Sequence, residues 1–283
     1  MRERFQAVFF LLSNFYLKGF LRGTIYQGRL KSLCLPGLNC WSCPGALGSC
    51  PMGALQGLLA AGRFPFYALG FLFVFGAALG RFVCGWLCPF GFFQDLLWKI
   101  PFFRKIGTFP GDRPLRRLKY GILVVFVILL PLLALDVFGL GLPWFCKWIC
   151  PGGTLFAGLP LAVANGGIRN LLGFLFFFKL GILLFLIALG IMIYRPFCKY
   201  LCPLGALYAG FNGLSLYRYG IARDKCTGCG HCAGTCPMNV DVLKNINGPE
   251  CIRCGRCRKS CPASAIGAGF GKEKNRLSLF PKI

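Results

Sequence analysis

Two copies of one cysteine pattern near the C-terminal end constrain this chain more than any other feature. The first copy runs from Cys226 to the Cys-Pro pair at 236–237, and the second runs from Cys251 to the Cys-Pro pair at 261–262. Each copy reads C-x2-C-x2-C-x3-C-P, a spacing that binds [4Fe–4S] clusters. Three closely spaced thiolates hold one side of a cube, and the fourth cysteine reaches the other cube.

The pattern therefore predicts two clusters in a C-terminal domain over residues 214–283. One cluster is predicted to use Cys226, Cys229, Cys232 and Cys261, and the other Cys251, Cys254, Cys257 and Cys236. Zinc also binds four thiolates, but two tandem copies that each end in Cys-Pro favour iron–sulfur clusters. The chemistry that such clusters support is the transfer of single electrons.

The rest of the chain is unusually apolar. Of its 283 residues, 56% are hydrophobic and only 14% are charged, and the mean hydropathy is +0.64. This composition predicts a mostly α-helical membrane protein. The apolar runs predict four transmembrane helices, at residues 5–21, 64–83, 120–138 and 171–194, and an interfacial helix at 92–103. The predicted domains are 1–62 (first helix and cysteine-rich loop), 63–213 (three-helix membrane part) and 214–283 (two-cluster ferredoxin-like α+β domain).

A second cysteine motif, C-x3-C-P, recurs beside the apolar segments. It is formed by Cys84 and Cys88, by Cys146 and Cys150, and by Cys198 and Cys202, and a further Cys-Pro pair follows at Cys50. Proline suits the first turn of a helix, so each of these Cys-Pro cysteines should lie at a helix N-terminus. The helix dipole and free N–H groups there stabilise an anionic cluster.

The predicted topology places these motifs on two faces of the membrane, as two parallel repeats. Two cysteine pairs on one face can complete a cube, so a third cluster is predicted on Cys84, Cys88, Cys198 and Cys202. A fourth, on the opposite face, is predicted to use Cys146, Cys150, Cys43 and Cys50, which leaves Cys34 and Cys40 available for a disulfide. An alternative is that Cys34, Cys40, Cys43 and Cys50 bind a cluster among themselves. Buried packing cysteines are the simplest other interpretation.

Charge suggests partners and orientation. The formal net charge is +24 before cluster binding, and the chain has no basic-aromatic nucleic-acid module. Basic residues between the second and third predicted helices indicate that the ferredoxin domain lies on the cytoplasmic side of the inner membrane. A basic ferredoxin surface favours an acidic soluble electron carrier or enzyme subunit as partner.

With CGWLCP, CKYLCP and the C-terminal cysteine runs in view, the chain resembles the membrane polyferredoxins of the NapH, NosR and CcoG type. The resemblance covers nearly the whole chain, although CKWICP and the segment CLPGLNCWSCPGALGSCP go beyond the NapH pattern. It implies an electron-transfer subunit of an oxidoreductase complex, with quinol dehydrogenase as one implied activity. The expected function is therefore transfer between a soluble partner and a quinone or outer-face acceptor.

Few ionisable or polar residues fall in the apolar part, and such residues are candidates for function. Gln94, Asp95 and Lys179 are the predicted contacts for a quinone, and no catalytic residue is predicted. The surplus cysteines of the first loop support an alternative function, in which the protein reduces a metal such as copper as an assembly factor.

Overall fold

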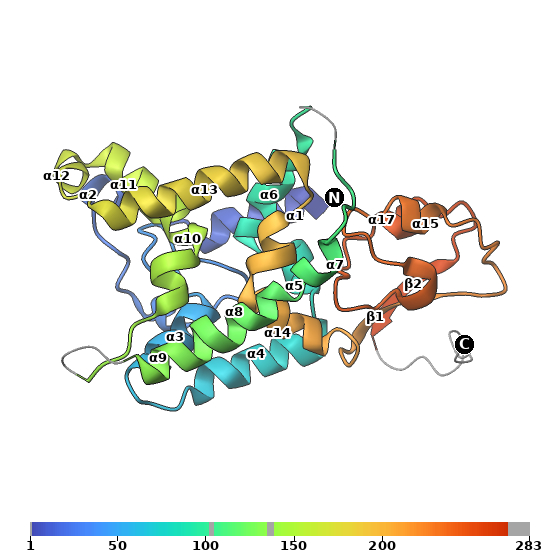
Figure 1. The fold of residues 1–283 in the computed structure, drawn as a ribbon, viewed down its shortest axis with the longest axis horizontal. Coiled ribbons are helices and arrows are strands. Elements are labelled where there is room, and N and C mark those ends of the chain that lie inside the picture. Colours follow the sequence, from blue (N-terminus) through green and yellow to red (C-terminus); the bar gives the residue numbers. More distant parts are fainter. Residues whose placement is uncertain (1, 102–104, 135–138, 271–283) are drawn as a thin grey trace.

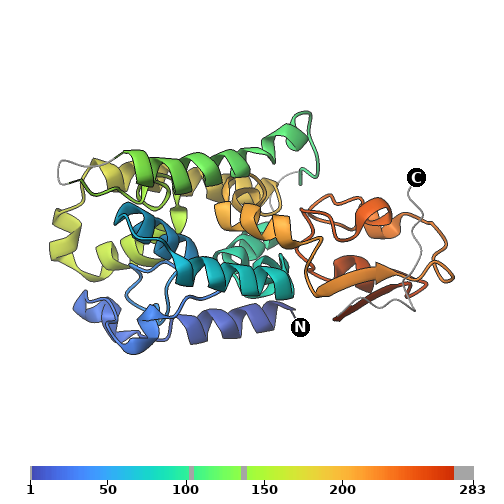
Figure 2. The same ribbon diagram turned by 90° about the horizontal axis from the view of Figure 1, so that it is seen from below.

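The structure is a computed structural model that describes residues 2–101, 105–134 and 139–270. It has a helical lobe and a smaller C-terminal lobe, which lie side by side along the longest axis (Figures 1 and 2). The α-helices of the helical lobe are α1 (Arg2–Ser13), α2 (Lys18–Arg22), α3 (Pro51–Ala60), α4 (Phe66–Leu79), α5 (Phe82–Trp86), α6 (Pro89–Lys99), α7 (Asp112–Leu115), α8 (Leu118–Ile122), α9 (Leu130–Leu133), α10 (Pro151–Gly153), α11 (Leu159–Ala164), α12 (Gly166–Asn170), α13 (Phe174–Met192) and α14 (Pro203–Phe211).

Wider π-helical turns occur at several points of this lobe. They are η2 (Leu123–Leu129), η3 (Phe145–Ile149), η4 (Thr154–Gly158) and η5 (Phe197–Leu201), and a single 3-10 turn, η1 (Arg29–Ser32), precedes the first cysteine loop. Two of the π-helical turns, η3 and η5, contain the first cysteine of a C-x3-C-P motif. Such turns are rare and often lie at functional sites.

Four Cys-Pro pairs of the helical lobe begin a helix, whereas the pair at Cys43 lies in a turn. Cys50, Cys88, Cys150 and Cys202 are the N-terminal caps of α3, α6, α10 and α14, and a proline follows each cap. Proline fits this position because its missing N–H would have no helical partner. The structure thus confirms the expected placement of these cysteines at helix N-termini.

The prediction of four transmembrane helices in two parallel repeats is wrong. Among the described residues, only α13 is long and apolar enough to cross a membrane. The first predicted helix ends at Ser13, where Asn14 turns its side chain back onto the Phe10 carbonyl. Helix α4 has fourteen residues and ends at Gly80, whose φ of 52° is left-handed. At 1.5 Å per residue, such a helix is about 21 Å long, shorter than a ~30 Å hydrocarbon core.

The other predicted segments also change. The third predicted helix becomes the continuous run α8–η2–α9, and its predicted end at 135–138 lies outside the described residues. The predicted interfacial helix at 92–103 begins earlier, as α6 at Pro89, and ends at Lys99. Both faces of α6 are covered, by α1 and by α13. Its polar residues Gln94 and Asp95 are therefore inside the lobe and not at an interface with lipid, whereas Lys99 at its end is exposed.

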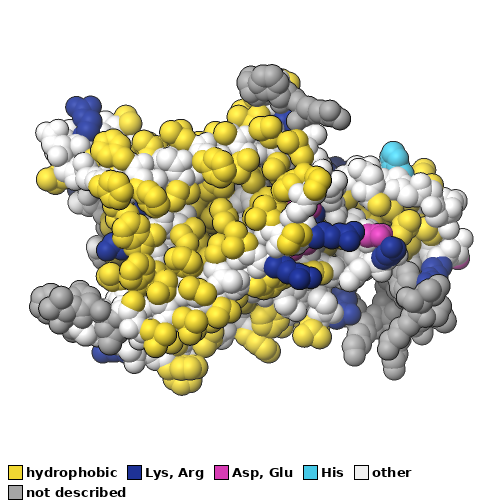
Figure 3. All heavy atoms as spheres, in the orientation of Figure 1, with side chains coloured by type: hydrophobic (Ala, Val, Ile, Leu, Met, Phe, Trp, Pro, Cys, Tyr) yellow, Lys and Arg dark blue, Asp and Glu magenta, His cyan; other side chains and the backbone are white. Residues whose placement is uncertain are grey.

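The surface of the helical lobe is apolar over much of the face in Figure 3, whereas basic side chains gather where the two lobes meet. Large aromatic side chains are exposed on two of its helices, among them Phe66 and Phe73 on α4 and Phe174, Phe177 and Phe185 on α13. An exposed apolar surface of this extent marks a contact with lipid or with another protein.

The C-terminal lobe is a small α+β unit. Strands β1 (Tyr217–Ile221) and β2 (Ile266–Phe270) pair antiparallel, with Ile221 opposite Ile266. The short helices α15 (His231–Gly234), α16 (Val242–Asn245) and α17 (Arg256–Lys259) lie between them. Because the first cysteine run follows β1 and the second precedes β2, the strand pair brings the two runs together.

Candidate iron–sulfur centres

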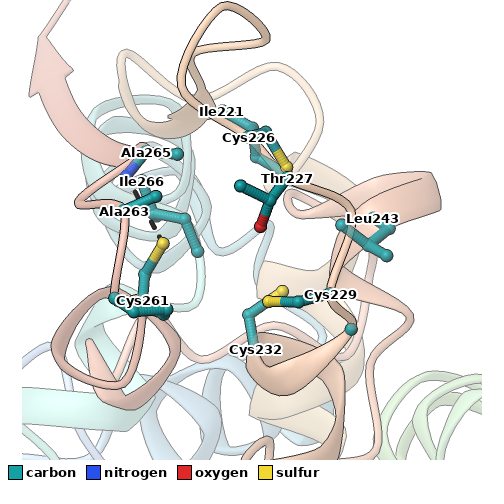
Figure 4. A pocket seen from close by; sticks show the side chains of 12 residues that line it. Ile221, Cys226, Thr227, Cys229, Cys232, Leu243, Cys261, Ala263, Ala265 and Ile266 are labelled. Atoms are coloured by element: carbon teal, nitrogen blue, oxygen red, sulfur yellow. Dashed lines mark hydrogen bonds between the residues drawn. The ribbon is translucent and has the colours of Figure 1, made fainter.

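The first thiol group, the outer ferredoxin set, lies near the surface of the C-terminal lobe. It consists of Cys226, Cys229, Cys232 and Cys261, which line one small cavity (Figure 4). The backbone N–H of Ala265 donates to Cys261 Sγ at 3.4 Å. Backbone donors around the exposed Cys229, first among them the N–H of His231, lower the pKa of that thiol. These four cysteines are the ones that the sequence assigns to a single cluster.

The second group, the inner ferredoxin set, consists of Cys236, Cys251, Cys254 and Cys257, which line another cavity together. Burial, followed by the neighbouring Cys254, raises the pKa of the Cys257 thiol to about 12. Burial likewise raises the pKa of Cys251 to about 11. Four such thiolates in one place need a compensating positive charge, which the iron of a cluster supplies. The residues therefore fit a [4Fe–4S] cluster.

The third group, the arginine set, consists of Cys84, Cys88, Cys198 and Cys202 from two C-x3-C-P motifs. All four are buried in the core of the helical lobe. Burial, and then Cys198, Cys84 and Cys88, raise the pKa of the Cys202 thiol, so the four sulfurs are electrostatic neighbours. The N–H of Gly91 donates to Cys88 Sγ at 3.4 Å, and the N–H of Gly205 donates to Cys202 Sγ at 3.3 Å. Such donors stabilise thiolates at a helix N-terminus.

Two fully buried arginines complete this set in a reciprocal way. Arg195, three residues before Cys198, donates to the Cys84 carbonyl at 2.5 Å. Arg81, three residues before Cys84, donates to the Cys198 carbonyl at 3.2 Å. A Cβ on Gly91 would lie 3.1 Å from Arg195 Nη1. Gly91 and Gly205, which lie three residues after Cys88 and Cys202, therefore leave room for the arginine from the opposite motif.

The fourth group, the lysine set, consists of Cys40, Cys50, Cys146 and Cys150, which line a cavity of about 680 Å³. The sequence analysis chose Cys43 instead of Cys40. In the structure, the Cys43 N–H donates to the Cys40 carbonyl in a tight turn, and of these two cysteines only Cys40 lines the cavity. Cys43 Sγ contacts the Phe156 carbonyl at 3.2 Å and packs with Ala46 and Ala157.

The predicted disulfide between Cys34 and Cys40 is also absent, since both cysteines are free in the structure. Cys34 lies beside the Ser49 hydroxyl, and its N–H donates to the Tyr67 hydroxyl at 3.1 Å. The alternative cluster on the four early cysteines would need Cys34 and Cys43 beside Cys40 and Cys50, whereas Cys34 lies beside the Ser49 hydroxyl and Cys43 beside the Phe156 carbonyl.

The three predicted quinone contacts have different surroundings. Lys179 Nζ donates to the Cys146 carbonyl at 3.1 Å and lines the cavity of the lysine set. Asp95 is buried and pairs with Arg195 at 2.5 Å and with Arg2 at 2.9 Å. Gln94 is buried and donates to Cys198 Sγ at 3.0 Å. Gln94 and Asp95 therefore act inside the arginine set, and only Lys179 reaches an open cavity.

The inner ferredoxin set and the arginine set lie in direct contact. The carbonyl oxygen of Ile252 approaches Gly85 so closely that a Cβ there would lie 2.2 Å away. Trp86 Nε1 donates to the Arg253 carbonyl at 3.0 Å. Each of these contacts joins the loop between two cysteines of one set to the loop between two cysteines of the other.

The junction is strengthened by a buried ion pair network. Arg81 pairs with Glu250 at 2.8 Å and donates to the Pro249 carbonyl at 2.6 Å. Lys119 pairs with the other oxygen of Glu250 at 2.5 Å. Burial alone would raise the pKa of Glu250, but Arg81 and Lys119 hold it below its usual value. The carboxylate next to Cys251 is thus fixed between two cations of the helical lobe.

The arginine set and the lysine set are joined by Leu38. Its N–H donates to Cys88 Sγ at 3.5 Å. A Cβ on Gly152 would lie 3.6 Å from both the Leu38 side chain and Cys150 Sγ. The sequence analysis placed these two sets on opposite membrane faces. The structure corrects this, because the first cysteine loop folds back into the core and brings the sets together.

No group of three or more His, Cys, Asp or Glu side chains in the described part of the chain is arranged to hold a single metal ion. Sequence reasoning missed Arg81, Arg195 and Gln56, which contact these cysteines or their neighbours. Their positions in the sequence could have indicated them. Arg81 and Arg195 each stand three residues before the first cysteine of a C-x3-C-P motif. Gln56 and Gln94 each stand six residues after a Cys-Pro cysteine.

Comparison with known proteins agrees with this chemistry. A family described as a 4Fe-4S binding domain matches residues 64–108, 121–160 and 172–221. The uncharacterized protein MJ0750 of Methanocaldococcus jannaschii is 30% identical over 175 residues, which are 61% of this chain and 65% of that protein. The ferredoxin-type protein NapH of Haemophilus influenzae is 32% identical over 166 residues, 58% of this chain and 50% of the relative.

A third relative is the putative electron transport protein YccM of Escherichia coli, 29% identical over 180 residues, 61% of this chain and 46% of that protein. The matched region thus spans about half to two thirds of each relative. No solved structure matches the chain. The cysteine runs, the matched 4Fe-4S binding domain and these relatives together support a NapH-like polyferredoxin, a ferredoxin-type [4Fe–4S] protein of electron transfer.

Proposed function

We propose that this chain conducts single electrons between a soluble partner at the C-terminal lobe and a quinone in the cavity of the lysine set. The observation that carries the proposal is the continuity of the four thiol sets. Each ferredoxin set and each helical set has four cysteines, enough for one [4Fe–4S] cluster. When bound, such a cluster accepts or releases one electron at a time.

The protein's own residues order the sets and hold them together. The outer set is at the surface, the inner ferredoxin set contacts the arginine set through Ile252 and Gly85, and Leu38 joins the arginine set to the lysine set. These contacts lie in the protein interior, where close packing fixes them, since Gly85, Cys88 and Ile252 are all buried. The side chains of the junction exclude water from the route and keep the neighbouring sets at a constant separation.

The soluble partner is proposed to be an acidic electron carrier or enzyme subunit. Three basic side chains, Lys225, Arg258 and Lys259, are exposed close to the ferredoxin cysteines. Arg253, a further basic residue of the second cysteine run, is fully buried and donates to the Leu79 and Asn212 carbonyls instead. A basic surface beside an exposed thiol set attracts an acidic partner and speeds its docking.

The quinone is proposed to enter the cavity of the lysine set from a membrane. This cavity of about 680 Å³ is far larger than the cavities of about 20 Å³ at the two ferredoxin sets, so it has room beside a cluster. Lys31, Lys179 and Asn39 line it, and the fully buried Asn39 side chain has no hydrogen-bond partner in the described structure. Lysine and asparagine N–H groups suit a quinone oxygen, and Leu38, Met52 and Phe145 suit its ring.

Membrane association is proposed to rest on α13 and the exposed apolar surface of the helical lobe. The basic side chains at the junction of the lobes (Figure 3) support an orientation in which the ferredoxin lobe faces the cytoplasm, under the positive-inside rule. In the alternative function, metal reduction, the surplus cysteines would be Cys34 and Cys43, which are both buried. Cys40 belongs to the lysine set, while Cys34 and Cys43 have separate partners.

The proposal is tested with the full chain in liposomes that contain a menaquinone. A reduced soluble ferredoxin should reduce the quinone, and Cys254→Ser, which breaks the inner ferredoxin set, should abolish the reaction. Lys179→Met should slow it, whereas Lys147→Met, outside the cavity lining, should not. Quinone reduction that survives Cys254→Ser would contradict the route.

A further inference from the structure

Two buried glutamines occupy equivalent positions in the arginine set and the lysine set. Gln94 stands six residues after Cys88 on α6, and Gln56 stands six residues after Cys50 on α3. Their exposed fractions are 2% and 0%. Each lies on a helix that begins at a Cys-Pro pair and faces the C-x3-C-P motif of a different segment.

The contacts of the two side chains match atom by atom. Gln94 Nε2 donates to Cys198 Sγ at 3.0 Å and to the Phe90 carbonyl, four residues back, at 3.5 Å. Gln56 Nε2 donates to Cys146 Sγ at 3.3 Å and to the Met52 carbonyl, four residues back, at 3.3 Å. In both sets the sulfur belongs to the first cysteine of the facing motif.

The other end of each amide fixes its orientation. The Phe197 N–H donates to Gln94 Oε1 at 3.1 Å, and the Phe145 N–H donates to Gln56 Oε1 at 3.0 Å. A backbone N–H requires an acceptor, so the oxygen must face it and the NH2 group must face the sulfur. The glutamine is therefore held as a donor to the cysteine that follows the phenylalanine.

An N–H donor to a cysteine sulfur stabilises negative charge on that sulfur. Hydrogen bonds to the cysteine sulfurs are among the factors that set the reduction potential of an iron–sulfur cluster. Reduction adds one electron to the cube and neither forms nor breaks a bond to the protein. Since the added electron increases the negative charge on the thiolates, a fixed N–H donor stabilises the reduced form more than the oxidised form.

We propose that Gln94 and Gln56 are positioning residues that each raise the reduction potential of the cluster held by their own thiol set. The inference rests on the proposed function, in which these two sets bind clusters. The electron that reduces either cluster comes from the neighbouring set along the route. A matched pair of donors keeps two successive centres close in potential, so that electrons pass in either direction.

The test is an EPR-monitored redox titration of the full chain, together with its iron and sulfide content. Gln94→Met preserves volume and removes the donor, and Gln56→Met does the same in the other set. At a fixed potential, each variant should lower the ratio of reduced to oxidised cluster by about three- to tenfold at one cluster and leave the other three unchanged. The two variants should affect different clusters.

Gln6→Met is the matched control, because Gln6 is also a buried glutamine but donates to Asp95 instead of a sulfur. It should leave the potentials of the lysine-set cluster and of both ferredoxin clusters unchanged and shift that of the arginine-set cluster less than Gln94→Met does. Gln94→Glu and Gln56→Glu keep the acceptor for the backbone N–H and replace the donor with a carboxylate, whose negative charge should lower the potential of the same cluster further.

Unchanged potentials in variants that retain their iron would overturn the inference. Loss of iron in both the Met and the Glu variants at both positions would also overturn it, because the glutamines would then be structural. A wild-type chain that binds only two clusters would instead overturn the proposed function, which the iron content reveals before any titration.

Discussion

The backbone N–H of Leu38 donates to the sulfur of Cys88 at 3.5 Å, and the Leu38 side chain lies against the turn that carries Cys150. One residue of the first cysteine loop thus touches both thiol sets of the helical lobe. Its position explains how the two sets serve one route. Centres at the two faces of a ~30 Å hydrocarbon core would be far apart, whereas these two sets are separated by a single side chain.

The choice between Cys40 and Cys43 gives a direct prediction. Cys40→Ser should remove the cluster of the lysine set and lower the iron content from about sixteen to about twelve atoms per chain. Cys43→Ser should leave the iron content unchanged, because Cys43 does not line the cavity and its Sγ contacts the Phe156 carbonyl. Iron and sulfide analysis of anaerobically purified variants measures both. The reverse result would show that the sequence-based choice of Cys43 is right and the structural assignment wrong.

Gly85 at the junction of the lobes has no room for a side chain. In Gly85→Ala, the new methyl group would meet the Ile252 carbonyl, so the ferredoxin lobe must shift. Overpacking of this kind costs about 1–3 kcal/mol, and electron transfer between the inner ferredoxin set and the arginine set should slow. Freeze-quench EPR after rapid reduction measures the rate. Gly70→Ala, on α4 with open space around it, is the control, and equal rates in the two variants would contradict the junction.

Asp112 connects α7 to the C-x3-C-P motif of Cys198 and Cys202. This contact gives a pH-dependent prediction. Its carboxylate pairs with Lys199 at 3.0 Å and accepts from the Tyr200 hydroxyl at 2.6 Å. Burial alone would raise the pKa of Asp112, but Arg116, Tyr200 and Lys199 hold it below its usual value. A carboxyl group with a lower pKa in the folded state stabilises the fold above about pH 4, and this contribution is lost as the pH falls through the folded-state pKa.

Asp112→Asn should therefore reduce the free energy of unfolding by about 3 kcal/mol at pH 7 and by less at low pH. Thermal unfolding in detergent at several pH values measures the difference between variant and wild type. Asp241→Asn, at an exposed position with a 3.7 Å pair to Lys244, should change little. A loss of stability that stays constant with pH would argue against an ionic role for Asp112.

The basic surface of the ferredoxin lobe predicts a salt-dependent association. Arg258→Glu or Lys259→Glu should slow docking of an acidic ferredoxin by about tenfold at low ionic strength, and the difference should shrink at high salt. Stopped-flow reduction of the full chain over a range of salt concentrations measures this. Lys18→Glu, on α2 in the helical lobe, is the control. An equal effect of Lys18→Glu would indicate a general charge effect and no specific docking surface.

Most of what could be predicted from the sequence depends on the spacing of cysteines and prolines within short stretches of the chain. The eight ferredoxin cysteines and the three C-x3-C-P motifs are recognisable because each needs only a few residues of consecutive chain. The helix starts at Cys50, Cys88, Cys150 and Cys202 follow from proline in the same way.

The rest depends on contacts between distant segments. Hydropathy predicted four spans because it measures apolar composition along a stretch of chain and does not register where a helix ends, as α1 does at Ser13 and α4 at Leu79. The selection of Cys40 over Cys43 depends on one turn, and the bond from Gln94 to Cys198 joins residues about a hundred positions apart. Such relationships leave no local pattern, although the equal offset of Gln56 and Gln94 from a Cys-Pro cysteine is visible in the sequence once the pairing is known.

The central claim is that four clusters form one continuous electron route. Iron and acid-labile sulfide per chain, measured on anaerobically purified protein together with EPR of stepwise-reduced samples, test it most directly. About sixteen iron atoms, with magnetic interaction between neighbouring centres, are the predicted result. About eight iron atoms, with signals from the ferredoxin lobe alone, would contradict the account.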